Sequence, residues 1–105
     1  MPNVSNVLPE PALDELEMVQ ILAALADPAR LTLAKYLYAT SQPVECGVAG
    51  KTVDLRPATL SHHWRILREA GLTRTFVEGR CRLLELRRAD LDRRFPGLLD
   101  AVLGQ

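Results

Sequence analysis

A set of cationic, hydroxyl and imidazole side chains recurs at helical spacing in the second half of the chain. Its members are Arg56, Thr59, Ser61, His62, Arg65 and Arg68. Guanidinium groups bind phosphate oxygens and the guanine edge, while hydroxyl and imidazole groups form hydrogen bonds with phosphates and base edges. This combination predicts contact with double-stranded DNA.

The same stretch offers no catalytic arrangement. Ser61 and His62 are neighbours whose side chains diverge on a helix, and no third group has the spacing needed to orient the imidazole. The sequence also shows no phosphate-binding loop and no clustered acid, base and nucleophile. We therefore expect that the protein is not an enzyme and that it uses no cofactor.

An apolar stripe backs the polar set. Leu60, Trp64 and Leu67 stand at i, i+4 and i+7, so they share one side of a helix. Pro57 is tolerated in a first turn, and Gly71 stands where a left-handed cap commonly ends a helix. We expect a helix over residues 57–70 that buries its apolar face and presents its polar face to the major groove, as a helix-turn-helix does.

Two short strands are expected directly after this helix. Residues 72–78 and 81–86 are rich in β-branched, aromatic and leucine residues, and Glu78-Gly79-Arg80 forms a tip between them. A hairpin that follows a recognition helix is the order of a winged helix-turn-helix, so the expected fold class is mainly α with a small β-hairpin. Three arginines are expected to carry the wing's DNA contacts: Arg74, Arg80 and Arg82.

Other elements must position the recognition helix. Residues 1–12 are rich in proline and predict a flexible N-terminal arm, while residues 13–105 predict one DNA-binding and dimerisation domain. Apolar periodicity predicts a sequence of helices over residues 13–25, 28–39, 47–53, 89–94 and 98–103. Residues 44–46 suit either a short strand or a loop.

Charge is distributed unevenly along a chain whose formal net charge is zero. The first 50 residues carry two basic and six acidic side chains, whereas residues 51–94 carry eleven basic and six acidic ones. The basic half holds the recognition helix and wing, which favours a DNA-facing surface with an acidic back. The zero net charge keeps an alternative open: a winged-helix protein-interaction module without DNA binding.

No membrane association is expected, since the chain does not begin with a basic segment followed by a long apolar run. The two cysteines, Cys46 and Cys81, do not form a disulfide framework. We therefore expect a cytoplasmic protein with reduced thiols.

Several motifs together resemble the ArsR/SmtB family of bacterial transcriptional repressors. They are LADPARL at residues 25–31, LSHH at residues 60–63, ILREAGL at residues 66–72 and EGR at residues 78–80. The resemblance covers roughly residues 15–103. It implies a homodimer paired through the first and last helices, an inverted-repeat operator, and release by an inducer, which in this family is often a metal ion.

The sequence offers apolar residues for such a dimer. The first and last helices carry more apolar side chains than a small core needs, and we expect a subunit interface at Leu16, Val19, Leu98, Leu99 and Val102.

The sequence departs from the family's metal sites. The family's thiol site uses paired cysteines near the third helix, where this chain has only Cys46. The family's other site uses Asp and His on the last helix, which here has no histidine, and the adjacent His62 and His63 point about 100° apart on a helix. We therefore expect no metal site, and the inducer stays unknown.

The two cysteines leave two interpretations open. Both can be small, partly buried apolar residues. Alternatively, one or both can form a thiol switch, with Cys46 just before the helix-turn-helix and Cys81 between two arginines that would favour a thiolate.

Overall fold

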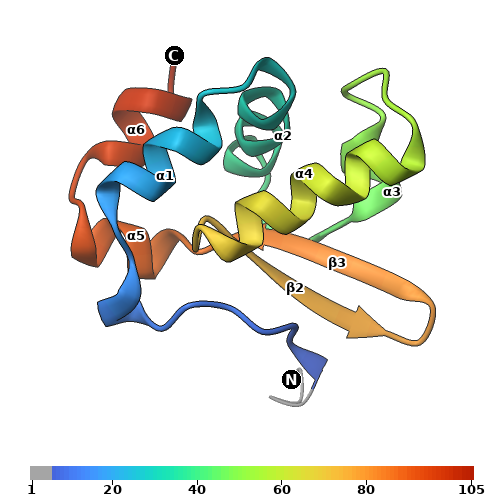
Figure 1. The fold of residues 1–105 in the computed structure, drawn as a ribbon, viewed down its shortest axis with the longest axis horizontal. Helices are drawn as coiled ribbons and strands as arrows, with labels where there is room; N and C mark the ends of the chain where they lie inside the picture. The colour runs from blue at the N-terminus through green and yellow to red at the C-terminus, as the bar shows by residue number, and fades with distance from the viewer. Residues whose placement is uncertain (1–5) are drawn as a thin grey trace.

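Helices and a small sheet alternate along the chain in the computed structural model, which describes residues 6–105 (Figure 1). A 3-10 turn at Leu13–Glu15 comes first. It is followed by α1 (Met18–Leu25), α2 (Pro28–Ala39), β1 (Val44–Glu45), α3 (Cys46–Gly50), α4 (Pro57–Glu69), β2 (Thr73–Glu78), β3 (Cys81–Leu86), α5 (Arg88–Arg94) and α6 (Leu98–Leu103). The expected winged helix-turn-helix is confirmed, with α3 and α4 as its helical pair and β2–β3 as its wing.

Helix α4 begins and ends at the residues that its sequence indicated. Pro57 occupies the first turn, and Gly71 follows the last turn with φ +90°. The N–H of Leu72 donates to the Leu67 carbonyl across this left-handed residue, which closes the helix. A Cβ at Gly71 would collide with the side chain of Leu16, so glycine is required there for space as well as for backbone conformation.

The sheet is larger than the expected hairpin. Its strand order is β1-β3-β2, all antiparallel, with Val44 opposite Leu84 and Thr75 on the other side of Leu84. Of the segment over residues 44–46, which suited either a strand or a loop, Val44 and Glu45 form a strand and Cys46 begins α3. A two-residue strand carries no readable periodicity, and its pairing with β3 depends on the tertiary fold.

The N-terminal arm, predicted to be flexible over residues 1–12, lies along the outer edge of β2 over residues 7–11. Val7 bridges Phe76, and the Leu8 N–H donates to the Thr75 carbonyl at 2.9 Å. Arg87 then donates to the Pro11 carbonyl at 2.7 Å. Residues 7–11 are thus held by the sheet and by Arg87, and the part of that prediction over residues 1–5 lies outside the described residues.

The first α-helix starts later than the expected Leu13. The Glu15 side chain accepts from the Ala12 N–H at 2.7 Å and closes a single 3-10 turn, after which Leu16 is extended with ψ 131°. Leu16 is only 1% exposed, and its carbonyl accepts a hydrogen bond from Arg94 at 2.7 Å. The prediction of a continuous helix over residues 13–25 is wrong because burial of Leu16 favours the extended backbone over the helical periodicity. The third helix is also shorter than expected, ending at Gly50.

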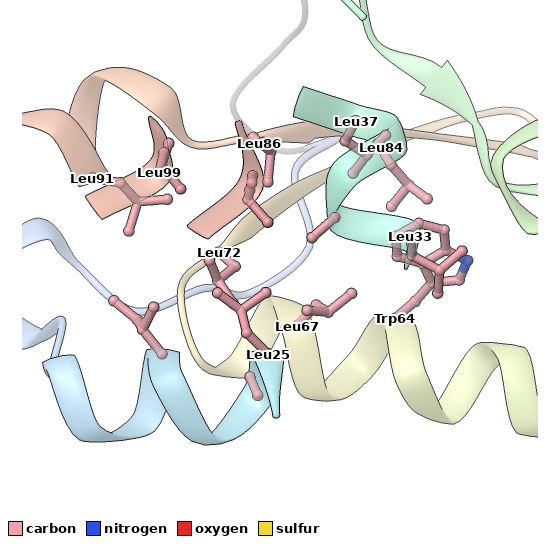
Figure 2. Close-up of a cluster of buried hydrophobic side chains, with 14 of the residues drawn as sticks. Leu25, Leu33, Leu37, Trp64, Leu67, Leu72, Leu84, Leu86, Leu91 and Leu99 are labelled. Carbon is pink, nitrogen blue, oxygen red and sulfur yellow. The ribbon is translucent and has the colours of Figure 1, made fainter. Parts of the chain in front are cut away.

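A leucine-rich core lies where α2, α4 and the sheet meet (Figure 2). Leu33 and Leu37 of α2 pack in the same cluster as Leu67 of α4 and Leu84 of β3, and Trp64 closes one end. Leu99 of α6 is 3% exposed and belongs to this core. The expectation that Leu16 and Leu99 are surplus to the core and free for a subunit interface is therefore wrong.

Candidate nucleic-acid interface

An open groove of about 280 Å³ runs along the exposed side of α4. Five lining residues come from α4 and one from β3: Ala58, Ser61, His62, Arg65, Arg68 and Arg82. This recognition groove brings together five of the predicted DNA-contacting residues. Three guanidinium groups and no carboxylate line it within the described part of the chain, so its field favours a polyanion.

The α4 side chains in the groove are held loosely. Arg65 is exposed, with Nη2 3.1 Å from His62 Nδ1 and Nε 4.0 Å from a Glu69 carboxylate oxygen. Exposed i,i+4 pairs contribute only about 0.3–0.5 kcal/mol. Arg65 can therefore exchange these partners for a phosphate or a base edge at little cost.

The start of α4 adds a second anion-attracting feature. Arg56 is the exposed N-cap residue and makes no side-chain capping bond, and Thr59 is exposed in the first turn. Backbone N–H groups in the first turn of a helix lack intrahelical acceptors and carry partial positive charge. Arg56 and this helix end together suit a phosphate of the DNA backbone.

The wing places its three arginines differently. Arg82 lies opposite Val77 in the β-ladder and lines the recognition groove, and Arg80 is exposed at the tip. Arg74 belongs to the opposite face of the sheet, because it alternates with Thr75, which packs under α4.

Arg74 is held by carboxylates. Its Nη2 lies 2.8 Å from one Glu10 oxygen and 3.4 Å from Asp90. The hydrogen bond to Glu10, with added attraction from Asp90, raises the pKa of Arg74 above its ordinary value. The prediction of Arg74 as a DNA contact is corrected, because Arg74 joins the arm to the sheet and α5.

One arginine that was not among the predicted functional residues, Arg30, supports α4. Arg30 of α2 donates from Nη1 to His63 Nδ1 at 3.1 Å and from Nε to the Ala24 carbonyl at 2.6 Å. His63 is buried, and Asp27 accepts from the Arg30 N–H at 3.0 Å. Arg30 thereby connects α1, α2 and α4. The LADPARL motif that contains it was the available signal, but its partner 33 positions away could not be identified from spacing.

The two thiols lie on opposite sides of the sheet, Cys46 at the start of α3 and Cys81 at the start of β3. Cys46 is half-buried and lines a cavity with Arg82, whereas Cys81 is exposed and alternates with Arg82 along the strand. Both are free thiols. Because their surroundings face opposite sides of the sheet, a direct bond between them needs rearrangement of the wing.

Residues 6–105 contain no group of three His, Cys, Asp or Glu side chains arranged to hold a metal ion. Over the same residues, every helix is too short or too polar to cross a lipid bilayer.

Comparisons with known proteins agree with this geometry. A model of a helix-turn-helix domain matches residues 25–75. The chain is 34% identical to YceK, an uncharacterised HTH-type transcriptional regulator of Bacillus subtilis, over 89 residues that cover 85% of this chain and 89% of the relative.

Solved structures show the same fold. The crystal structure of an ArsR family transcriptional regulator superposes with a TM-score of 0.66 at 24% identity, covering 80% of this chain and 90% of that one. HlyU from Vibrio cholerae superposes with a TM-score of 0.65 at 25% identity, covering 83% of this chain and 91% of that one.

Proposed function

We propose that this chain, which belongs to the helix-turn-helix transcriptional regulators, is a cytoplasmic homodimeric repressor of the ArsR family. It binds an inverted-repeat DNA operator through α4 and the β2–β3 wing, and an inducer releases it. Membership among the helix-turn-helix transcriptional regulators makes the protein a regulator of transcription and not an enzyme.

The recognition groove is the observation that carries the proposal. Arg65, Arg68 and Arg82 converge there from two elements, and Ser61 and His62 add hydrogen-bonding groups between them. Arginine is the side chain best matched to the guanine edge and to phosphate, and hydroxyl or imidazole groups can contact neighbouring base edges. A helix of this composition in the major groove, with Arg80 at the wing tip near the backbone, follows the docking geometry of helix-turn-helix proteins.

The dimer is supported by apolar surface outside the core. Val19 of α1 is 77% exposed, and Met18 and Leu22 beside it are also exposed. Leu98 and Val102 of α6 are only half-buried. Val19, Leu98 and Val102 keep the place expected from sequence, and Met18 and Leu22 replace Leu16 and Leu99, which are inside the subunit.

The inducer is proposed to act on a thiol. Cys46 begins α3, the helix that precedes the recognition helix in the chain, and Cys81 begins β3 at the wing tip. A modification at either site would alter an element that contacts DNA.

The operator test begins with selection of bound fragments from random duplex DNA. Fluorescence anisotropy then compares a selected duplex, a duplex with one half-site and a scrambled duplex over a range of salt concentrations. We expect an inverted repeat and an affinity that falls steeply with salt, because phosphate contacts release counterions. Failure to enrich any sequence, together with salt-independent binding, would favour the protein-interaction module.

The inducer test uses the same anisotropy measurement with diamide or peroxide present. We expect oxidant to release the wild-type protein and to have less effect on Cys46→Ser or Cys81→Ser. If oxidant leaves the DNA affinity of the wild-type protein unchanged, the thiol switch is wrong, whereas the proposal of operator binding is unaffected.

A further inference from the structure

A second, smaller cavity of about 60 Å³ lies beneath α4, on the inner side of the recognition groove. Its lining comes from the start of α3, from α4 and from both strands of the wing: Cys46, Ser61, Trp64, Arg68, Thr75, Arg82 and Leu84. Ser61, Arg68 and Arg82 also line the recognition groove. We refer to this space as the sub-helix cavity.

Three buried polar atoms on its lining residues have no hydrogen-bond partner within residues 6–105. They are Trp64 Nε1, Arg68 Nε and Thr75 Oγ1. Trp64 is 6% exposed and Thr75 is 1% exposed, so solvent does not satisfy them from outside. The Trp64 ring stands at the edge of the leucine cluster with its nitrogen on the outer side (Figure 2). Buried polar groups without partners destabilise a fold, and three around one small cavity indicate an occupant.

The chemistry of these atoms selects the kind of occupant. An indole N–H and an arginine Nε–H can only donate, and a threonine hydroxyl can donate as well. Arg68 and Arg82 bring two positive charges to the lining, and no carboxylate of the described chain joins them. A water molecule would also have to place its own two hydrogens, whereas an anion accepts from all three donors and matches the charge.

We propose that the sub-helix cavity binds a small inorganic anion of halide or nitrate size, held by Trp64 Nε1, Arg68 Nε and Thr75 Oγ1. The cavity volume exceeds what a single water needs and suits an ion of this size. A bound anion would fix the side chains of Arg68 and Arg82 in one arrangement. These two arginines also line the recognition groove. That consequence rests on the proposed function, but the binding itself does not, and it is measured without DNA.

The test uses the only tryptophan of the chain. The indole N–H of Trp64 gives a single resonance in a ¹H–¹⁵N correlation spectrum. The full-length protein is titrated with sodium chloride, bromide or nitrate at constant ionic strength, with sodium gluconate as the balancing salt because gluconate is too large for the cavity. We expect a saturable shift of the indole resonance with the small anions and none when gluconate is varied alone.

Two variants remove donors in different ways. Thr75→Val keeps the β-branched shape that a strand favours, and Arg68→Met keeps most of the aliphatic stem. Each is expected to weaken anion affinity by about tenfold or more, as loss of a hydrogen bond to a charged group should. Arg93→Met is the matched control, because Arg93 is exposed on α5, lines neither the recognition groove nor the sub-helix cavity, and should leave anion affinity unchanged.

Far-UV circular dichroism checks the fold of each variant, and Thr75→Val decides the result if Arg68→Met does not fold. An indole resonance that ignores all three small anions would overturn the proposal and assign the cavity to water. A saturable shift of equal affinity in the wild type and in Thr75→Val would also overturn it, because the proposed donor would not hold the ion.

Discussion

Arg65 and Arg74 show how one residue type takes two roles nine positions apart. Arg65 is exposed on α4, and within residues 6–105 its polar contacts are confined to His62 and Glu69 on the same helix surface. Arg74 is bidentate to Glu10, which comes from the arm 64 positions away. The first guanidinium is available to a ligand, whereas the second is already occupied by an ion pair of the fold.

Arg65→Ala is expected to weaken binding to the selected operator by about 1–3 kcal/mol if Arg65 contacts a base edge. Anisotropy on the operator and on a scrambled duplex measures the change, and the loss should be larger on the operator. Arg93→Ala removes an exposed arginine from α5 and serves as the control. Equal operator affinity for Arg65→Ala and wild type at every salt concentration would show that Arg65 does not contact the DNA.

Arg80→Ala is expected to cause a smaller loss of affinity on both duplexes and a shallower salt dependence than Arg65→Ala.

Arg74→Met is expected to have the opposite profile. Operator affinity should stay unchanged, while the free energy of unfolding falls by about 1 kcal/mol, a modest effect because the ion pair is partly exposed and screened. Urea unfolding followed by circular dichroism measures the stability, and anisotropy measures the affinity. A large loss of DNA affinity with unchanged stability would restore Arg74 to the DNA contacts predicted from sequence.

At the scale of elements, the start of α2 contains a titratable cap. Asp27 is the N-cap residue, and its carboxylate accepts from the Arg30 N–H at 3.0 Å. This hydrogen bond, with help from the nearby positive charge of Arg30, holds the pKa of Asp27 below its ordinary value of 3.8, although burial opposes the shift. The cap therefore favours the ionised carboxylate in the folded state.

The sign of the pH dependence follows from this lowered pKa. The stability contributed by ionised Asp27 is fully present above its ordinary pKa and is lost as the pH falls through the lowered value. The Asp27→Asn substitution introduces an amide that cannot ionise but still caps a helix. Urea unfolding at pH 5 and pH 2 should therefore show a larger loss for wild type than for Asp27→Asn.

The exposed Asp54 at the turn before α4 supplies the control, and Asp54→Asn should lose stability with acid as the wild type does. Asp27→Ala, which removes the cap, should cost about 1 kcal/mol at neutral pH. A wild type and an Asp27→Asn protein with parallel acid profiles would show that the cap is not linked to protonation.

At the scale of the whole molecule, apolar side chains fall into two groups with different expected roles. Leu99 is 3% exposed inside the core, and Val19 is 77% exposed on α1. Val19→Glu should therefore lower the mass in solution from dimer to monomer without unfolding the subunit. Leu99→Glu should unfold the chain, because truncation of a buried leucine alone costs about 2–5 kcal/mol and a buried unpaired charge costs more.

Light scattering after size exclusion at micromolar concentration measures the mass, and circular dichroism measures the fold. A Val19→Glu protein with the mass of the wild-type dimer would move the subunit interface away from α1. A wild type that is monomeric under these conditions would contradict the dimer, since two half-sites one helical turn apart require two linked readers.

Elements whose signals lie within a few residues could be predicted from the amino-acid sequence. The stripe of Leu60, Trp64 and Leu67, together with Pro57 and Gly71, located α4 to within one residue of its observed end. The hairpin over residues 72–86 and the family motifs were predicted on the same local basis, because helical period, turn chemistry and capping involve neighbours in the chain.

Contacts between groups far apart in the chain could not be predicted in this way, because they depend on how the elements pack. Leu16 was predicted to belong to an apolar stripe of the first helix. In the structure it has an extended backbone outside that helix, and its side chain fills the space beside Gly71. Arg74 was predicted to be a DNA-contacting residue of the wing, but it forms an ion pair with Glu10, which lies 64 positions earlier in the chain. The unpartnered donors of Trp64 and Thr75 come together only when α4 packs on the sheet. These outcomes depend on burial and charge pairing between segments far apart in the chain, for which local spacing carries no information.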